Sequence, residues 1–205
     1  KGCMDHLGKD ISWPWLYGGT GHAFIIRIYD NVDVQAVTDW DPQMIYDLAP
    51  NLGFKVSGFK EGGGPPGQFP TRQKEAWDLV RSKIDQGLPC YGWELKAPYG
   101  EYWIINGYDD VGYYYDGWET GGPTPWEKLG KQFINNLEVR CVELGKPASD
   151  AKTVREAIVK ALVFDASNDP KAEYRNGVEA FELWAQALEA GDKAKRDHHT
   201  YNLDC

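Results

Sequence analysis

Long hydrophobic runs are missing from this 205-residue sequence. No apolar stretch approaches the roughly 20 residues that a helix needs to cross a bilayer. No basic segment followed by an apolar one opens the chain, as a secretory signal would require. These absences predict a soluble, cytoplasmic protein with no membrane partner. The sequence begins at Lys1 without a methionine and stops at Cys205, so one or both ends could be incomplete.

Positive charge is also scarce. Lys and Arg total 22 against 31 Asp and Glu, which gives a formal net charge of −9 at pH 7. A surface of this charge repels phosphate backbones over the Debye length. The composition therefore argues against nucleic acid as a partner.

Cysteine is sparse, and its spacing excludes two common site types. Neither a zinc site nor a dense disulfide framework is indicated, because no CxxC pair occurs. The adjacent His198 and His199 match no metal-ligand spacing. The phosphate-cradling glycine motifs and the GxSxG elbow are absent as well. We expect reduced thiols and neither a metal nor a cofactor. The four cysteines are Cys3, Cys90, Cys141 and Cys205.

Aromatic residues, in contrast, are abundant. The chain has nine Trp and twelve Tyr, and four of the Trp and seven of the Tyr crowd into residues 91–126 around glycines. Such crowding predicts either a tightly packed sheet or a surface on which a ligand stacks. The candidate ligand-binding side chains are Trp93, Tyr102, Trp103 and Trp118.

Hydrophobic periodicity predicts an α+β fold. Apolar residues at helical spacing and turn residues at the boundaries define the helices, and short alternating runs define the strands. An antiparallel meander is expected where three strands follow one another after residue 88.

We divide the chain into an α+β domain over residues 1–145 and a helical section over 146–205. The expected helices are a turn carrying Cys3, a short helix near Pro14, 42–52, 72–86, a turn at 126–129, 151–165 and 172–190. The expected strands are 22–28, 54–59, 89–95, 101–108, 111–115 and 137–144, with glycine- and proline-rich loops at 61–70 and 121–125.

Cys3 and His22 form the first candidate catalytic pair. A thiol becomes a useful nucleophile when a helix N-terminus or an imidazole lowers its pKa. The alternative is that Cys3 is a small buried apolar residue and His22 a strand histidine bonded to a carbonyl. His6 is a weaker imidazole candidate.

Glu101 is the candidate carboxylate. Alternation places Glu101 and Trp103 on one face of their strand and Tyr102 on the other. A carboxylate buried among aromatic rings needs a partner or a role; the alternative is a glutamate at a strand start that faces water. Glu94, which is followed closely by Lys96, is expected to be solvated.

Several segments together resemble a papain-like bacterial family. These are a cysteine near the start of a helix, Gly18–Phe24 (GGTGHAF), Gly87–Cys90 (GLPC) and Glu101–Asp109 (EYWIINGYD). The sequence looks most similar to the butirosin-biosynthesis acyltransferase group and, more distantly, to the bacteriocin-processing cysteine peptidases. The resemblance implies a papain-like fold, in which N-terminal helices pack on an antiparallel sheet.

The same resemblance implies that a thiolate attacks an acyl carbonyl. Cys3 would be the nucleophile, His22 the base and Glu101 the orienting carboxylate. One departure matters: the family's hairpin strand begins with the catalytic histidine, and Glu101 or Tyr102 stands in that place here. No histidine lies between His22 and His198.

Two functions from different classes follow from these observations. The first is cysteine-dependent hydrolysis or acyl transfer on a small molecule or peptide. The alternative is a non-catalytic scaffold that binds a small ligand in an aromatic-lined cleft. A homo-oligomer is left open by the sequence.

Overall fold

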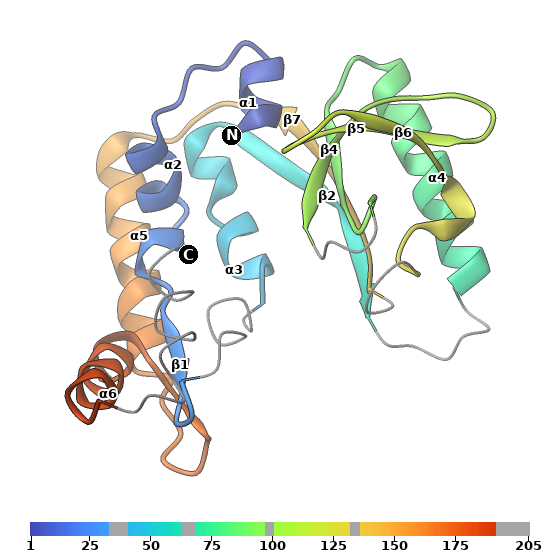
Figure 1. Cartoon of the computed structure of the whole chain (residues 1–205). Coiled ribbons are helices and arrows are strands. Elements are labelled where there is room, and N and C mark those ends of the chain that lie inside the picture. The colour runs from blue at the N-terminus through green and yellow to red at the C-terminus, as the bar shows by residue number, and fades with distance from the viewer. Residues whose placement is uncertain (33–40, 63–68, 97–100, 132–135, 192–205) are drawn as a thin grey trace. The chain divides into compact units, whose positions relative to one another are not determined.

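The computed structural model is an α+β structure that describes residues 1–32, 41–62, 69–96, 101–131 and 136–191. Contacts divide the chain into two compact units. We call residues 1–12 and 54–145 the sheet unit, and residues 13–53 and 146–205 the helical unit (Figure 1). Residues 13–53 thus group with the segment after residue 145, and residues 1–12 with the sheet.

The described strands of the sheet unit form one antiparallel sheet in the order β2-β7-β3-β4-β5-β6. The meander predicted from the alternating runs after residue 88 is confirmed as β3, β4 and β5, although β7 pairs with β3 on its other side. The strands are β2 (Phe54–Gly62), β3 (Cys90–Trp93), β4 (Tyr102–Tyr108), β5 (Gly112–Asp116), β6 (Gly121–Pro125) and β7 (Asn136–Leu144).

The glycine- and proline-rich stretch at 121–125 was expected to be a loop, and this prediction is wrong. It forms β6 at the edge of the sheet, where a proline that lacks an N–H does not interrupt a ladder on its free side. The Thr124 hydroxyl fixes the strand by donating to the Leu95 carbonyl at 2.6 Å. The following turn is the short helix η4 (Trp126–Lys128), as predicted.

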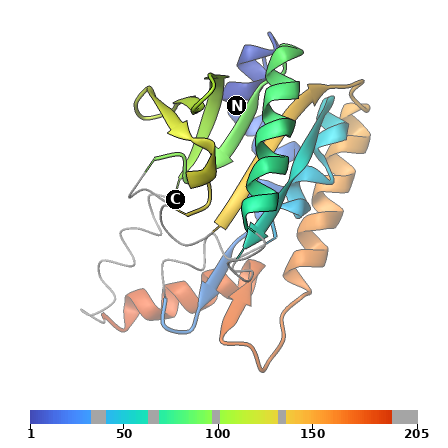
Figure 2. The same cartoon turned by 90° about the vertical axis from the view of Figure 1, so that its right-hand side faces the viewer.

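Helix α4 (Phe69–Asp85) covers one face of this sheet (Figure 2). The apolar stripe of the helix supplies Ala76, Trp77 and Val80 to the core. Cys90, Val139 and Cys141 meet the stripe from the sheet, and all three are fully buried. The short helix α1 (Gly2–His6) contacts Ile104 of β4 through Gly2.

The helical unit is built from short segments and two longer helices. The strands β1 and β8 pair antiparallel, and α6 packs on them through Ala180, which lies against Ile28. The elements are α2 (Trp13–Gly19), η1 (His22–Phe24), β1 (Arg27–Tyr29), α3 (Gln43–Tyr46), η3 (Ala49–Leu52), α5 (Asp150–Asp165), β8 (Tyr174–Asn176) and α6 (Gly177–Glu189).

Three predicted elements of the helical unit differ from the structure. Residues 22–28 do not form one strand, because Gly21 in a left-handed conformation starts a 3-10 turn and the strand begins only at Arg27. The helix predicted over 42–52 is divided into α3 and η3, and Pro50 stands at the start of η3, where its missing N–H is tolerated. The last helix starts at Gly177, since residues 174–176 pair with β1.

Close packing of helices in this unit explains why position 19 is a glycine. Gly19, the last residue of α2, has no room for a side chain, because an added Cβ would lie 2.6 Å from Leu52 and 3.1 Å from Thr153. The absence of a side chain lets α2 pack tightly against η3 and α5.

None of the helices within the described ranges is both long enough and apolar enough to cross a bilayer.

Candidate ligand-binding face

The face of the sheet that points away from α4 gathers aromatic and charged side chains. Residues two apart in a strand share a face, so Tyr91 and Trp93 of β3 lie on the same side as Tyr102 of β4 and as Glu138 and Arg140 of β7. The register agrees, with Trp93 opposite Tyr102 and Tyr91 opposite Arg140. We call these five residues the aromatic face.

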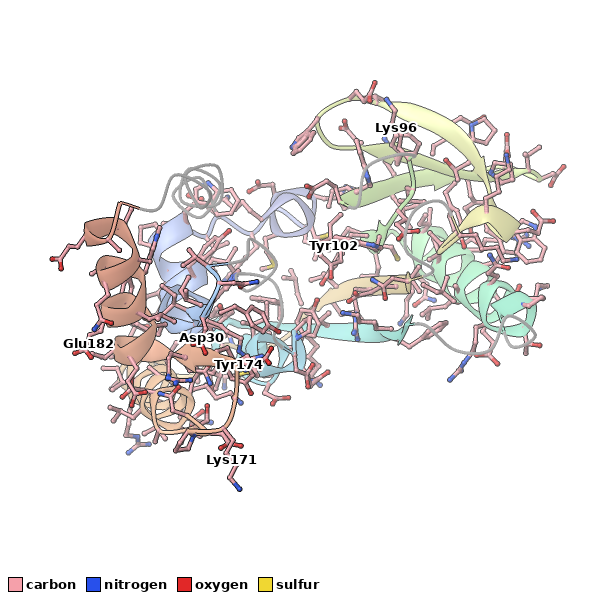
Figure 3. All side chains as sticks on the ribbon, turned by 60° about the horizontal axis from the view of Figure 1, so that its bottom comes forward. Asp30, Lys96, Tyr102, Lys171, Tyr174 and Glu182 are labelled. Carbon is pink, nitrogen blue, oxygen red and sulfur yellow. The ribbon has the colours of Figure 1, made fainter. Side chains whose placement is uncertain are left out.

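Tyr102, which is labelled in Figure 3, contacts two other rings of this face. Its ring centroid lies 4.8 Å from that of Trp93 and 5.7 Å from that of Tyr91, and both contacts are edge-to-face. Such contacts stabilise a ring position beyond the area that they bury. Tyr102 nevertheless remains 43% exposed.

A hydrogen bond to Glu138, which forms a buried ion pair with Arg140, holds the hydroxyl of Tyr102 in place. The Tyr102 hydroxyl donates to Glu138 Oε2 at 2.9 Å, and Arg140 Nε donates to Glu138 Oε1 at 3.0 Å. Glu138 is fully buried, and the Arg140 side chain is only 11% exposed. Burying a carboxylate is costly unless it is paired and hydrogen-bonded, and both conditions are met here. The phenol ring is therefore held in one place by a rigid polar group.

Glu94 adds a second buried carboxylate beside the aromatic face. It is fully buried, so the expectation of a solvated side chain is wrong. Its backbone adopts φ +57°, which is uncommon for a residue other than glycine, and its N–H donates to the Glu101 carbonyl at 3.2 Å. This conformation brings its Oε1 within 3.2 Å of the Trp93 indole N–H.

The four side chains that the sequence predicts to contact a ligand do not all lie together in the structure. Trp93 and Tyr102 contact each other, with ring centroids 4.8 Å apart. Trp103 does not join them, because alternation turns it into the core, where it is 2% exposed and packs edge-to-face on Tyr115. Trp118 lies after β5 and is 78% exposed.

Glu138 and Arg140 were missed by sequence reasoning. The segment 137–144 was recognised as a strand, but its charged residues were not singled out. The available signal was their spacing: both lie at positions that alternate with Leu137, Val139 and Cys141, so they share a face opposite the core.

Cys3 lies in α1 and is 5% exposed. Burial raises the pKa of its thiol to about 11. A nucleophilic cysteine requires the opposite, namely a pKa lowered toward neutrality. Cys3 in this environment has the properties of the buried apolar residue that the sequence left as the alternative.

His22 and Glu101, the other two predicted catalytic residues, have separate surroundings. His22 belongs to the helical unit, where its ring stacks on Tyr17 at 4.7 Å and burial lowers its pKa. Glu101 belongs to the sheet unit, like Cys3, and is half-buried immediately before β4. Among the described residues, no hydrogen bond or ion pair connects Cys3 with Glu101. The predicted trio thus includes residues of both units.

A hollow of about 250 Å³ lies elsewhere in the sheet unit, between α1 and the start of β3. His6 and Asn106 supply polar groups to it, and Leu88 and Ile104 supply apolar ones. Cys3 is not among the described residues that line it. Within the described ranges, no three His, Cys, Asp or Glu side chains converge as metal ligands.

We expect Cys3 to react slowly with iodoacetamide in the folded protein. With a pKa of about 11 against the ordinary 9.0, its thiolate fraction at pH 7 is roughly a hundredfold smaller, and burial slows access further. The rate should keep rising through pH 9 and 10 instead of levelling off. Mass spectrometry of peptides after timed labelling measures it, and the urea-unfolded chain is the control. Rapid labelling of Cys3 at pH 6 would contradict this expectation and favour the nucleophile.

Comparison of the chain with protein-family models, curated proteins and solved structures finds no match. The papain-like resemblance therefore stays a prediction from the sequence motifs, and the function has to be argued from the residues themselves.

Proposed function

We propose that this protein binds a small organic ligand on the aromatic face of the sheet unit. The observation that carries the proposal is Tyr102: the residue is 43% exposed, yet its ring is fixed by two neighbouring rings and by the buried Glu138. An exposed aromatic side chain held rigidly loses little conformational entropy when a ligand stacks on it. A rigid ring beside buried polar groups is a common composition of small-molecule sites.

The ligand expected from these side chains has a flat, apolar part and at least one polar group. The flat part would stack on Tyr102 and the edge of Trp93, where ring contacts contribute about 0.5–1.5 kcal/mol each. The polar group would lie near the guanidinium of Arg140, whose side chain is 11% exposed. An aromatic or sugar-like small molecule meets both requirements.

We favour ligand binding over cysteine catalysis because the surroundings of Cys3 do not suit a nucleophile. Burial raises the pKa of the Cys3 thiol to about 11, which leaves almost no thiolate near neutral pH. The papain-like fold and the cysteine-dependent acyl chemistry remain predictions from the resemblance, and the labelling of Cys3 tests the chemistry independently of ligand binding.

Replacing Tyr102 by alanine is expected to abolish binding of small aromatic probes. A suitable panel is 2-phenylethylamine, 2-phenylethanol and 3-phenylpropionate, observed by saturation-transfer NMR. The expected result is transfer to at least one probe in the original chain and a loss of about tenfold or more in affinity in Tyr102→Ala.

Tyr114→Ala is the matched control for this experiment. Tyr114 is 37% exposed on β5 of the same sheet, and its hydroxyl donates to the Asp109 carboxylate at 2.9 Å, as that of Tyr102 does to Glu138. Its replacement should leave probe binding unchanged. Equal losses in the two variants, or no binding to the original chain, would refute the proposal.

A further inference from the structure

We infer that the hollow of the sheet unit, between α1 and the start of β3, is a second binding site, which takes a short aliphatic carboxylate. This site goes beyond the proposed function, because none of the five residues of the aromatic face is among the described residues that line the hollow. Its volume is about 250 Å³, whereas sites for drug-sized ligands have roughly 300–1,000 Å³. Only a small molecule therefore fits.

Two polar residues line the hollow, and both are accessible from solvent. His6 is the last residue of α1, and Asn106 belongs to β4. Both residues are exposed, and neither side chain has a hydrogen-bond partner among the described residues. A protonated imidazole has two N–H donors, and a side-chain amide has two more. These donors are thus available to a molecule that enters the hollow.

A β-bulge places Asn106 at the hollow. Ile105 of β4 lies opposite Tyr115 of β5, and Gly107 lies opposite Tyr114. Two steps along β4 thus match one step along β5, and Asn106 is the extra residue. A bulge leaves its extra residue unpaired, redirects a side chain and is common next to functional sites. The irregularity of β4 therefore has a role in the proposed site.

The remaining walls of the hollow are aliphatic. Leu88 and Pro89 precede β3, Ile84 lies near the end of α4, and Ile104 belongs to β4. Beside them, Gly87 has open space where a Cβ would stand, because no other atom lies within 4 Å of that position. Burial of hydrocarbon against such walls favours binding. Since no aromatic ring is among the described lining residues, the ligand expected here is aliphatic.

A carboxylate suits the two polar residues better than an alcohol or an amine. It has two oxygens that only accept hydrogen bonds, and both the His6 imidazole and the Asn106 amide have N–H groups to donate. A hydrogen bond from a protonated imidazole to a carboxylate is charge-assisted and roughly twice as strong as a neutral one. An alcohol lacks the charge, and an ammonium group has no acceptor.

The charged groups near His6 are engaged with other side chains. Asp5 of α1 forms an ion pair with Lys1. At the end of α4, Lys83 pairs with a glutamate of β7 and Asp85 accepts from a tyrosine of β4. Neither β3 nor β4 contains a charged residue, and His6 is the only titratable residue among the described lining residues. Histidine side chains usually become charged between pH 8 and 5, so binding should strengthen as the pH falls.

Titration of the full chain with 4-methylpentanoate, observed by NMR of the protein, tests this inference. The probe 4-methylpentan-1-ol has the same shape and no charge. We expect the carboxylate to bind at pH 6 with a dissociation constant of about 1–10 mM and the alcohol about tenfold more weakly. At pH 8 the carboxylate should also bind about tenfold more weakly, because the imidazole is then largely neutral. His6→Gln should reduce the affinity at pH 6 to the value at pH 8 and remove the pH dependence, and Asn106→Ala should weaken binding at both pH values.

His22→Gln is the matched control, because His22 belongs to the helical unit and is not among the described residues that line the hollow. It should leave the affinity and its pH dependence unchanged, as should Tyr102→Ala. Absence of carboxylate binding at about 50 mM, an alcohol that binds as tightly, or equal losses in His6→Gln and His22→Gln would overturn the inference. None of these results bears on the aromatic face. If Tyr102→Ala alone abolishes carboxylate binding, the ligand occupies the aromatic face, and the second site is wrong while the proposed function stands.

Discussion

Replacing Glu138 by leucine is expected to lower the free energy of unfolding by about 3–5 kcal/mol. The Glu138 carboxylate is fully buried and accepts from Arg140 Nε at 3.0 Å. Its removal leaves the largely buried guanidinium without this carboxylate and the Tyr102 hydroxyl without its acceptor. Urea-induced unfolding followed by tryptophan fluorescence measures the change.

A second ion pair of the same strand serves as the control for Glu138. Glu143 of β7 pairs with Lys83 of α4, but its side chain is 38% exposed. Exposed pairs contribute about 0–1 kcal/mol, so Glu143→Gln should have a small effect. The double variant Glu138→Leu with Arg140→Met should recover most of the stability, since two apolar side chains need no partner. A Glu138→Leu variant as stable as Glu143→Gln would show that the pair is not structurally important.

Replacing Trp103 by alanine is expected to lower the free energy of unfolding by about 3–5 kcal/mol. Trp103 is 2% exposed and packs on Tyr115 with ring centroids 5.1 Å apart, so its loss leaves a large cavity in the core. Trp118→Ala should change stability by only about 0.5 kcal/mol, because that side chain is 78% exposed.

Comparing the two variants tests whether Trp103 is buried and Trp118 is exposed, as in the structure. Both were candidate ligand contacts on sequence grounds, and both can be measured by thermal and urea unfolding under the same conditions. Equal stability losses in Trp103→Ala and Trp118→Ala would contradict the burial of Trp103. A large loss in Trp118→Ala alone would contradict its exposure.

Hydrophobic periodicity predicted most of the long helices and strands. The apolar stripe of Ala76, Leu79, Val80 and Ile84 predicted α4, and that of Val154, Ala157 and Ile158 predicted α5. Such stripes are local in sequence and record which side of an element is buried. Short elements were less predictable: residues 121–125 pair as an edge strand because β5 lies next to them, and no local pattern encodes that neighbour.

The candidate site was predicted only in part, for a similar reason. Alternation correctly placed Tyr102 opposite Trp103 on the two faces of β4, but it could not tell which face was covered by a helix. Trp103 was therefore grouped with Tyr102 as a ligand contact, although α4 and its core occupy that side. Glu138 and Arg140 come from a strand 36 residues or more beyond Tyr102, and their role depends on the pairing of β7 with β3.

The sequence by itself determined the α+β class, the long helices, the meander of strands and the negative charge, because each depends on composition or on the period of one segment. The tertiary structure decided which side chains are enclosed: it buried Cys3 and raised its pKa, and it brought Glu138 under Tyr102. Desolvation and ion pairing are set by neighbours that are distant in the chain, so neither can be read from the residue types alone.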